Sequence, residues 1–286
     1  METKPECLAC LLTQGSRVAA LIAPEDQQLR MRIVRIWAER IAGFSLSQLQ
    51  SSPPLLAAEL YAITRECCGV DDPFHAYKCD VNAKILERLP ALRGVVAAAQ
   101  DRLKAALSLA LTANFIDAGA AVQHDWEAAL LRTTEDVGTG YASFLAALER
   151  TRRLLILGDN AGEIGLDVLL VQELRARGCD VVYAVRGGPV LNDATHDDAE
   201  LFGLTALCRV IDTGDRTPGV DLDRSSPEFL RELARAGLVL SKGQGNFESL
   251  EVHRPDIFFG FKAKCEAVSR ALGVPLGATV FRQGGA

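Results

Sequence analysis

The first half of the chain places apolar residues at the spacing of α-helices. Between Arg30 and Ile41 apolar side chains recur about every 3.6 positions, with arginine and glutamate between them. The alanine-rich segment 95–111 combines a helical pattern with high helix propensity, and a last helix is expected from Asp136 to Arg150. Breaks are expected at three proline-containing segments: 51–54, 71–73 and 90–94. The pattern predicts an all-α domain over residues 1–150.

After Arg152 short apolar runs alternate with helix-length amphipathic segments. The expected strands are Leu154–Leu157, Val181–Val185, Arg209–Ile211, Leu238–Leu240 and Ile257–Phe261. The expected helices include Gly162–Arg177, Pro227–Ala236 and Cys265–Leu272. Strands without polar alternation, each followed by a helix, are typical of a parallel sheet buried on both faces. We therefore expect residues 151–286 to form an α/β domain whose ligands bind beyond the carboxyl ends of the strands.

Two loops at this expected sheet edge carry oxygen ligands. Asp159 and Asn160 follow the first strand, and Asp193 lies in the loop after the second. Carboxylate and amide oxygens are the ligands that hard cations such as Mg²⁺ and Mn²⁺ prefer. The alternative is that these residues cap the helices that follow them. The sequence thus indicates a candidate cation site, with helix capping as the simpler interpretation.

Cations occupy the ends of two further strands. Lys242 and Gly243 begin a glycine-rich turn after the fourth strand, and Lys262 ends the fifth. A lysine beside backbone N–H groups suits a phosphate or carboxylate, although the GxxxxGK spacing of a Walker motif is absent. A solvated surface lysine is the alternative for Lys262. Oxygen ligands that face cations across one sheet edge favour metal-assisted phosphoryl hydrolysis.

Composition excludes some partners. The 286 residues carry 31 Lys and Arg against 37 Asp and Glu, a net charge of −6, and 49% are hydrophobic. This is the composition of a globular protein, and its acidity argues against nucleic acids and anionic membranes as main partners. No signal peptide or membrane-spanning run is visible, so a cytoplasmic location is expected. A small phosphorylated ligand remains compatible with these features.

The eight cysteines do not form the pattern of a disulfide-stabilised domain. Cys7 and Cys10 make a CxxC pair with no second pair at zinc-finger spacing. Two buried thiols on a helix are one interpretation. A second metal site or a redox pair, with Cys79 or Cys265 nearby in space, is the other.

Four loop motifs carry a resemblance to a known family. GDNAGEI, RGGPVLNDAT, SKGQGNFE and FKAKC follow successive strands, and ECLACLLTQ, DPFHAYKCDVNAKIL and ANFIDAG occur in the helical half. In this order the motifs resemble the damage-control phosphatase family, also known as the ARMT-like metal-binding domain and formerly as a domain of unknown function. CxxC and KGQxN are typical of its smaller prokaryotic members. The resemblance implies a helical N-terminal domain and a Rossmann-like three-layer α/β/α domain around one active site.

The resemblance also implies roles for individual residues. It assigns one divalent cation (Mn, Co, Ni or Mg) to three residues, which are also the catalytic set: Asp159, Asn160 and Asp193. It assigns substrate or phosphate binding to Lys242, Gly243, Gln244, Gly245, Asn246, Lys262, Lys78 and Asn82. Supporting roles beside the site fall to Asn114, Asp117 and Glu163.

The function that we expect is metal-dependent hydrolysis of phosphate esters of small metabolites, such as sugar phosphates or damaged phosphometabolites. Water is the expected nucleophile, and an aspartyl-phosphate at Asp159 or Asp193 is the alternative. A methyltransferase that uses S-adenosylmethionine is the second hypothesis, although Arg186 ends the second strand where such an enzyme has an acid. A non-catalytic module that binds metal or sugar phosphate is the third.

Overall fold

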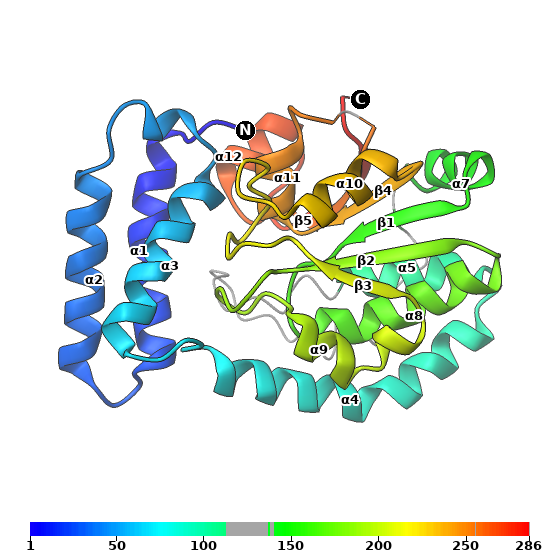
Figure 1. Cartoon of the computed structure of the whole chain (residues 1–286), viewed down its shortest axis with the longest axis horizontal. Coiled ribbons are helices and arrows are strands. Elements are labelled where there is room, and N and C mark those ends of the chain that lie inside the picture. Colours follow the sequence, from blue (N-terminus) through cyan, green and yellow to red (C-terminus); the bar gives the residue numbers. More distant parts are fainter. Residues whose placement is uncertain (113–136, 138–139, 255, 286) are drawn as a thin grey trace.

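The first three helices form a bundle on one side of the molecule (Figure 1). The computed structural model describes residues 1–112, 137, 140–254 and 256–285. Helices α1 (Pro5–Ile22), α2 (Gln27–Ala42) and α3 (Pro53–Cys68) pack around Trp37, whose side chain is fully buried. The indole Nε1 of Trp37 donates to Thr64 Oγ1 at 2.9 Å, and Tyr61 meets the indole ring edge-on. The bundle therefore has a hydrophobic core of its own.

The next helices confirm two of the expected breaks and correct the third. Breaks occur before α3 and between α3 and α4 (His75–Ala98), but Pro90 lies inside α4 rather than at a break. Leu89 and Leu92 on either side of it are buried, so packing keeps the helix continuous through the proline. Segment 95–111 is divided between α4 and α5 (Arg102–Thr112), because the side chain of Asp101 accepts from Lys104 N and starts a new helix.

All five expected strands are confirmed within one six-stranded sheet. They are β1 (Arg153–Leu157), β2 (Asp180–Val185), β3 (Arg209–Asp212), β4 (Leu238–Lys242) and β5 (Phe258–Lys262). The strand order is β3-β2-β1-β4-β5-β6, and the first five strands are parallel. The sixth, β6 (Thr279–Gln283), was not expected and pairs antiparallel with β5. From β1 the chain adds β2 and β3 on one side of the sheet and then β4 and β5 on the other. Sheets of this kind bind ligands at the point where the chain changes sides.

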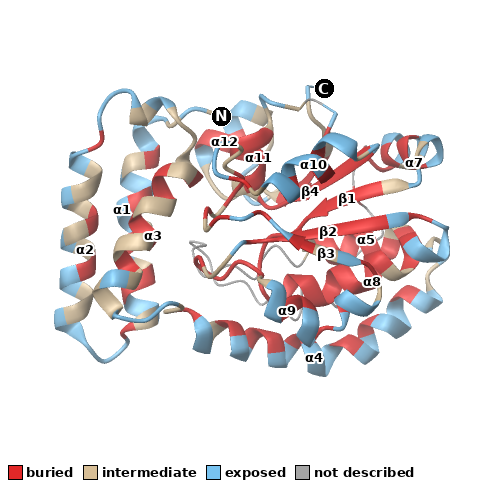
Figure 2. Ribbon diagram, in the orientation of Figure 1, coloured by how far each residue is buried: buried red, intermediate tan, exposed pale blue. Residues whose placement is uncertain are grey.

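Both faces of the sheet are covered by helices, which confirms the expected three-layer architecture. Alternate residues of β1 contribute to two cores: Leu154 and Ile156 to one, Leu155 and Leu157 to the other. The first core includes residues of α4, α5, α7 (Gly140–Arg150), α8 (Glu163–Ala176) and α9 (His196–Leu201). The second includes residues of α10 (Pro227–Arg235), α11 (Gln244–Leu250) and α12 (Glu266–Leu272). The buried strands lie between these helical layers in Figure 2.

The hydrophobic cores do not divide at residue 150. The described residues before β1 contain helices and no strands, as the sequence predicts. However, α4, α5 and α7 pack on the sheet, whereas α1 to α3 enclose a separate core. Within the described part of the chain, no helix combines the length and apolar character needed to cross a membrane.

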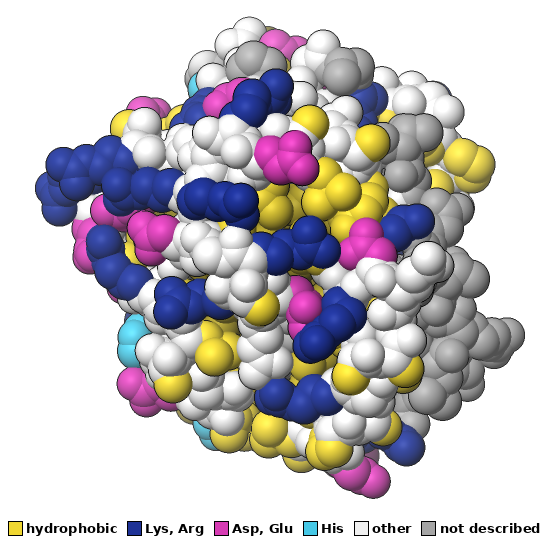
Figure 3. Space-filling model, turned by 90° about the vertical axis from the view of Figure 1, so that its right-hand side faces the viewer, with side chains coloured by type: hydrophobic (Ala, Val, Ile, Leu, Met, Phe, Trp, Pro, Cys, Tyr) yellow, Lys and Arg dark blue, Asp and Glu magenta, His cyan; other side chains and the backbone are white. Residues whose placement is uncertain are grey.

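The two ends of the sheet differ in their surroundings. The carboxyl ends of the strands point toward the bundle (Figure 1), and the opposite face carries many Lys and Arg side chains around hydrophobic ones (Figure 3). At the amino ends of β1 and β3, Arg153 and Arg209 both pair with Glu232. Ion pairs therefore balance part of the positive charge on this side, and the candidate site lies at the other end.

Candidate active site

The loops after β1 and β2 are joined by hydrogen bonds that bring the predicted metal ligands together. Ala194 N donates to Asp159 O and Ala161 N donates to Asn192 O, both at 2.8 Å, with an antiparallel bridge between Asn160 and Asp193. The side chains of Asp159, Asn160 and Asp193 line one pocket of about 430 Å³. The topology of the sheet thus places these three residues in one site.

Hydrogen bonds fix the orientation of the Asn160 amide. Its Nδ2 donates to Asp159 Oδ2 at 3.0 Å and to Glu163 Oε1 at 2.7 Å. Because ionised carboxylates only accept hydrogen bonds, the nitrogen must lie on this side and Oδ1 on the other. The amide oxygen therefore points away from Asp159 Oδ2 and Glu163 Oε1. Glu163 supports this arrangement from a fully buried position.

A buried arginine holds the Asp193 side of the site. Arg186 Nε donates to Asp193 Oδ2 at 2.6 Å, and its Nη2 donates to Asn246 Oδ1 at 2.9 Å. The guanidinium also reaches within 3.9 Å of Asp159 Oδ1. Arg186 is 3% exposed, so its charge is balanced by these carboxylates rather than by solvent. The motif RGGPVLNDAT begins with Arg186, but the sequence alone did not predict that Arg186 holds Asp193.

Lys242 does not reach the pocket, which corrects its predicted place as a phosphate anchor. Its Nζ donates to Asp167 Oδ1 at 2.7 Å and to Glu163 Oε2 at 3.1 Å, and the side chain is 1% exposed. Burial alone lowers the pKa of Lys242, but the two carboxylates outweigh it and raise the pKa above its ordinary value. The ammonium is therefore charged and is used to hold Glu163. Burial raises the pKa of Glu163, yet both its oxygens accept hydrogen bonds, the arrangement of an ionised carboxylate.

These contacts form one ion network, which consists of Asp159, Asn160, Glu163, Asp167, Arg186, Asp193 and Lys242. All seven residues are buried. Four carboxyl groups face the two cations Arg186 and Lys242, and the charge of Lys264 also acts on Glu163, so the network has an excess of at most two negative charges. Buried charge without a counterion is costly, and a bound divalent cation would neutralise it. Among the described residues no group of three His, Cys, Asp or Glu side chains could hold a metal, so the candidate site depends on the Asn160 amide.

Two predicted substrate residues of the KGQGN segment instead shape the site. Gly243 has a φ of +86°, and a Cβ built there would lie 2.2 Å from Asp159 Cγ. Asn246 is fully buried; its Nδ2 donates to Lys242 O and to Gly158 O, while its Oδ1 accepts from Arg186. Neither residue lines the pocket. Gly243 leaves room for the carboxyl group of Asp159, and Asn246 holds the guanidinium group of Arg186.

The pocket cation at the end of β5 is Lys264, not Lys262. Lys262 is the last residue of β5, and its Nζ donates to Thr279 Oγ1 on the neighbouring strand. The chain passes the sheet edge two residues later, where Lys264 lines the pocket. Gln244 and Gly245 also line it, as predicted. Both lysines stand in FKAKC, but the length of the strand determines which of them reaches the site.

The predicted residues of α4 lie outside the pocket lining. Lys78 Nζ pairs with Asp72 Oδ2 at 2.6 Å, and Asn82 Nδ2 donates to Asp198 Oδ1 at 2.7 Å. Asp198 belongs to α9, which follows the Asp193 loop, so Asn82 connects α4 to that loop. The other two predicted support residues, Asn114 and Asp117, lie outside the described residues.

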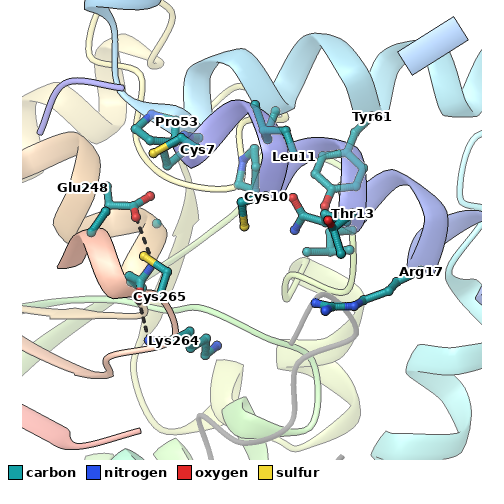
Figure 4. A pocket seen from close by; sticks show the side chains of 18 of the residues that line it. Cys7, Cys10, Leu11, Thr13, Arg17, Pro53, Tyr61, Glu248, Lys264 and Cys265 are labelled. Atoms are coloured by element: carbon teal, nitrogen blue, oxygen red, sulfur yellow. Dashed lines mark hydrogen bonds between the residues drawn. The ribbon is translucent and has the colours of Figure 1, made fainter. Parts of the chain in front are cut away.

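Helices α1 and α3 of the bundle line one side of the pocket (Figure 4). We call this side the helical wall; it consists of Glu6, Cys7, Cys10, Leu11, Thr13, Gln14, Arg17, Pro53, Pro54, Ala57 and Tyr61. Cys265 lines the pocket from the start of α12. Burial raises the pKa of Cys7, Cys10 and Cys265, which favours protonated thiols. Cys7 is buried and Cys10 exposed, and a second-metal or redox role for the pair stays a prediction.

The Asp193 loop is also anchored in the bundle. Val190 and Leu191 belong to the hydrophobic core of α1 to α3. Leu191 has a φ of +46°, a left-handed conformation that costs about 1–3 kcal/mol for a residue with a Cβ. Burial of its side chain offsets that cost. The bundle therefore positions the loop that carries Asp193 as well as the helical wall.

Comparisons with known proteins identify the family of the chain. The family model "Damage-control phosphatase ARMT1-like domain" matches residues 3–280. A damage-control phosphatase of Pyrococcus horikoshii is 33% identical over 290 residues, covering 98% of this chain and 97% of the relative. A damage-control phosphatase of Archaeoglobus fulgidus is 28% identical over 294 residues, covering 97% of each chain.

A solved structure extends the similarity to the fold. The crystal structure of a DUF89 family protein from Pyrococcus horikoshii matches with a TM-score of 0.83 and 30% identity, covering 99% of both chains. The family model and the solved structure both match nearly the whole chain. The chain belongs to the damage-control phosphatase ARMT1-like domain family, as its loop motifs indicate.

Proposed function

We propose that the protein is a metal-dependent phosphatase that hydrolyses phosphate monoesters of small metabolites. Its family, and the names of the relatives from Pyrococcus horikoshii and Archaeoglobus fulgidus, support a phosphatase role on damaged metabolites. The metal dependence and the phosphomonoester class are the finer parts of the proposal, and they rest on the pocket.

The observation that carries the proposal is the convergence of three oxygen donors on a buried network with excess negative charge. Asp159, Asn160 and Asp193 would hold the cation, and because Asn160 Nδ2 is engaged by Asp159 and Glu163, Oδ1 is the atom that the amide would offer. A divalent cation bound there would supply Lewis-acid polarisation of a phosphoryl group. Mg²⁺, Mn²⁺, Co²⁺ and Ni²⁺ all accept such a donor set.

The remaining groups of the pocket suit the phosphate and its leaving group. Lys264 lines the same cavity as the three donors, where an ammonium would neutralise phosphate oxygens. Arg17 adds a second cation from the helical wall. Asp159 and Asp193 would both be occupied as ligands of the cation, which makes either of them a poor covalent nucleophile. Water is therefore the nucleophile that we propose.

The test is phosphate release from a panel of phosphate monoesters with each of the four cations. We expect D159N and D193N to lower kcat/KM at least a hundredfold, because each removes a charged ligand. D80N is the matched control, since Asp80 is an exposed residue of α4 that pairs with Lys84. Chelation should abolish the activity, and re-addition of the cation should restore it.

Three outcomes would contradict the proposal. Turnover that survives chelation or D159N would exclude the metal site as the catalytic centre. Tight sugar-phosphate binding without turnover would favour the non-catalytic module. Micromolar binding of S-adenosylmethionine would favour the methyltransferase.

A further inference from the structure

A buried chain of hydrogen bonds runs from β2 to Asn160 at the candidate metal site. Tyr183 Oη donates to Asp167 Oδ2 at 2.6 Å, and Lys242 Nζ donates to Asp167 Oδ1 at 2.7 Å. Lys242 Nζ also donates to Glu163 Oε2 at 3.1 Å, and Asn160 Nδ2 donates to Glu163 Oε1 at 2.7 Å. All five residues are buried, and of the five Asn160 alone lines the pocket. The chain therefore reaches a ligand only through Asn160.

The direction of these hydrogen bonds is set by Lys242 in the middle of the chain. A lysine ammonium can only donate, and an ionised carboxylate can only accept. Every carboxylate oxygen of Asp167 and Glu163 accepts at least one hydrogen bond from the chain. The two ends differ, because the Tyr183 hydroxyl group can also accept, whereas the Asn160 amide reverses only by exchanging its nitrogen and its oxygen. Asn160 must therefore turn its nitrogen to Glu163.

Reversal of the Asn160 amide would change the site. Oδ1 is the atom that the amide would offer to a cation, and a protonated amide nitrogen cannot replace it. The reversed amide would also turn Oδ1 to Asp159 Oδ2, which now accepts from Nδ2 at 3.0 Å. Residues that orient a metal ligand by hydrogen bonds typically change metal affinity about 10–100-fold when they are replaced.

We propose that Glu163 is a positioning residue whose carboxylate, directed by Lys242, keeps the Asn160 amide in the orientation that binds a divalent cation. This inference rests on the proposed function, because it takes Asn160 as a ligand of the cation. It predicts that cation affinity depends on the direction of the hydrogen bond between Glu163 and Asn160 and not on charge alone.

Calorimetric titration with Mn²⁺ tests the inference without substrate or turnover. In E163Q the ammonium of Lys242 still requires an acceptor, so the new amide must turn its oxygen to Lys242 and its NH₂ group to Asn160. Two NH₂ groups would then face each other unless the Asn160 amide reverses. We expect the Kd for Mn²⁺ to rise about 10–100-fold in E163Q.

Two further variants separate orientation from charge. D167N also removes one negative charge beside Lys242, but its amide oxygen can face Lys242 while the Tyr183 hydroxyl group turns to accept from its NH₂ group. The Kd should therefore change by less than about threefold, because the Asn160 amide keeps its orientation. E163D keeps the charge on a side chain that is one methylene shorter, so the carboxylate loses its contact with Asn160 or with Lys242. We expect the Kd to rise about tenfold in E163D.

The double variant E163Q/K242M tests the part that Lys242 plays. Without the ammonium, the amide at position 163 can turn its oxygen to Asn160. E163Q should therefore raise the Kd by less than about threefold when it is added to K242M. A role of Glu163 in stability alone would not produce this rescue, and denaturant unfolding of each variant measures stability separately.

Several results would overturn the inference. They are wild-type affinity for Mn²⁺ in E163Q or E163D, equal weakening in D167N and E163Q, and an equal cost of E163Q with and without Lys242. A wild-type protein that binds no Mn²⁺ would overturn it too. If E163Q does not fold, the comparison of E163D with D167N decides between orientation and charge. Failure of the proposed function is distinguishable, since it appears as absent phosphate release from a protein that binds Mn²⁺ as predicted.

Discussion

The two sides of the pocket differ in how firmly their polar groups are held. In the ion network each side chain is buried and bonded to its neighbours, for example Asn160 to Glu163 and Lys242 to Asp167. The helical wall instead presents thiols, prolines and a tyrosine from a bundle with its own core. In the function that we propose, the sheet would hold the groups that need exact geometry, and the bundle would contact the rest of the ligand. The two sides are not independent, because Val190 and Leu191 of the Asp193 loop pack in the core of the bundle.

Loss of the Lys242 charge should have the largest effect on stability. K242M leaves Glu163 and Asp167 buried without their cation, which we expect to cost about 3–5 kcal/mol of unfolding free energy. Denaturant unfolding measures this. K84M is the matched control, since Lys84 makes an exposed pair with Asp80 and should change stability by less than about 1 kcal/mol. Equal losses of unfolding free energy in K242M and K84M would show that the buried ion pairs of Lys242 stabilise the protein no more than the exposed pair of Lys84 and Asp80.

The Glu248 carboxyl group should make stability depend on pH. Burial raises the pKa of Glu248 from 4.5 to about 7, although the hydrogen bond from Gln244 and the charge of Lys264 oppose the rise. Because the folded state holds this proton more tightly, its contribution to stability is complete below pH 4.5 and is lost as pH rises through about 7. The difference in unfolding free energy between E248Q and wild type should therefore shift by on the order of 3 kcal/mol between pH 4.5 and 8. A constant difference across this range would contradict the assignment.

Two glycine substitutions, with smaller expected effects on stability, should distinguish the strain of a left-handed backbone from a steric clash with Asp159. In G243A the new Cβ would clash with Asp159, and the φ of +86° adds strain. In G69A the φ is +67°, but no atom lies within 4 Å of the Cβ, so only the strain remains. We expect G69A to cost about 1 kcal/mol and G243A about 1–3 kcal/mol more. Calorimetry should show weaker Mn²⁺ binding in G243A alone, and equal binding in both would remove Gly243 from the site.

The same comparison explains what the sequence could predict. Short apolar runs identify β1 to β5, and polar residues after β1 and β2 identify Asp159, Asn160 and Asp193 as neighbours, because parallel strands end at one edge. β6 was not predicted, because its sequence TVFRQ alternates polar and apolar residues only in part and the strand lies at the edge of the sheet. Pro90 suggested a break, yet the buried leucines beside it keep α4 continuous.

The sequence did not predict which polar side chains are buried and which line the pocket. Lys242 and Lys264 have equivalent local signals, a lysine beside a strand end, but one is buried among carboxylates and the other lines the pocket. Arg186 and Glu248 stand in recognised motifs, and their partners Asp193, Asn246 and Gln244 become evident only in three dimensions. Sequence spacing gives the edge of the sheet, whereas the direction of a side chain depends on packing.

The most direct test of the central claim is the anomalous scattering of Mn²⁺ in crystals of the wild-type protein. We predict one peak within coordinating distance of the carboxylates of Asp159 and Asp193 and of Asn160 Oδ1, and no such peak in D193N. A peak that lies instead at Cys7 and Cys10, or a wild-type crystal with no peak at the end of β1, would contradict the account.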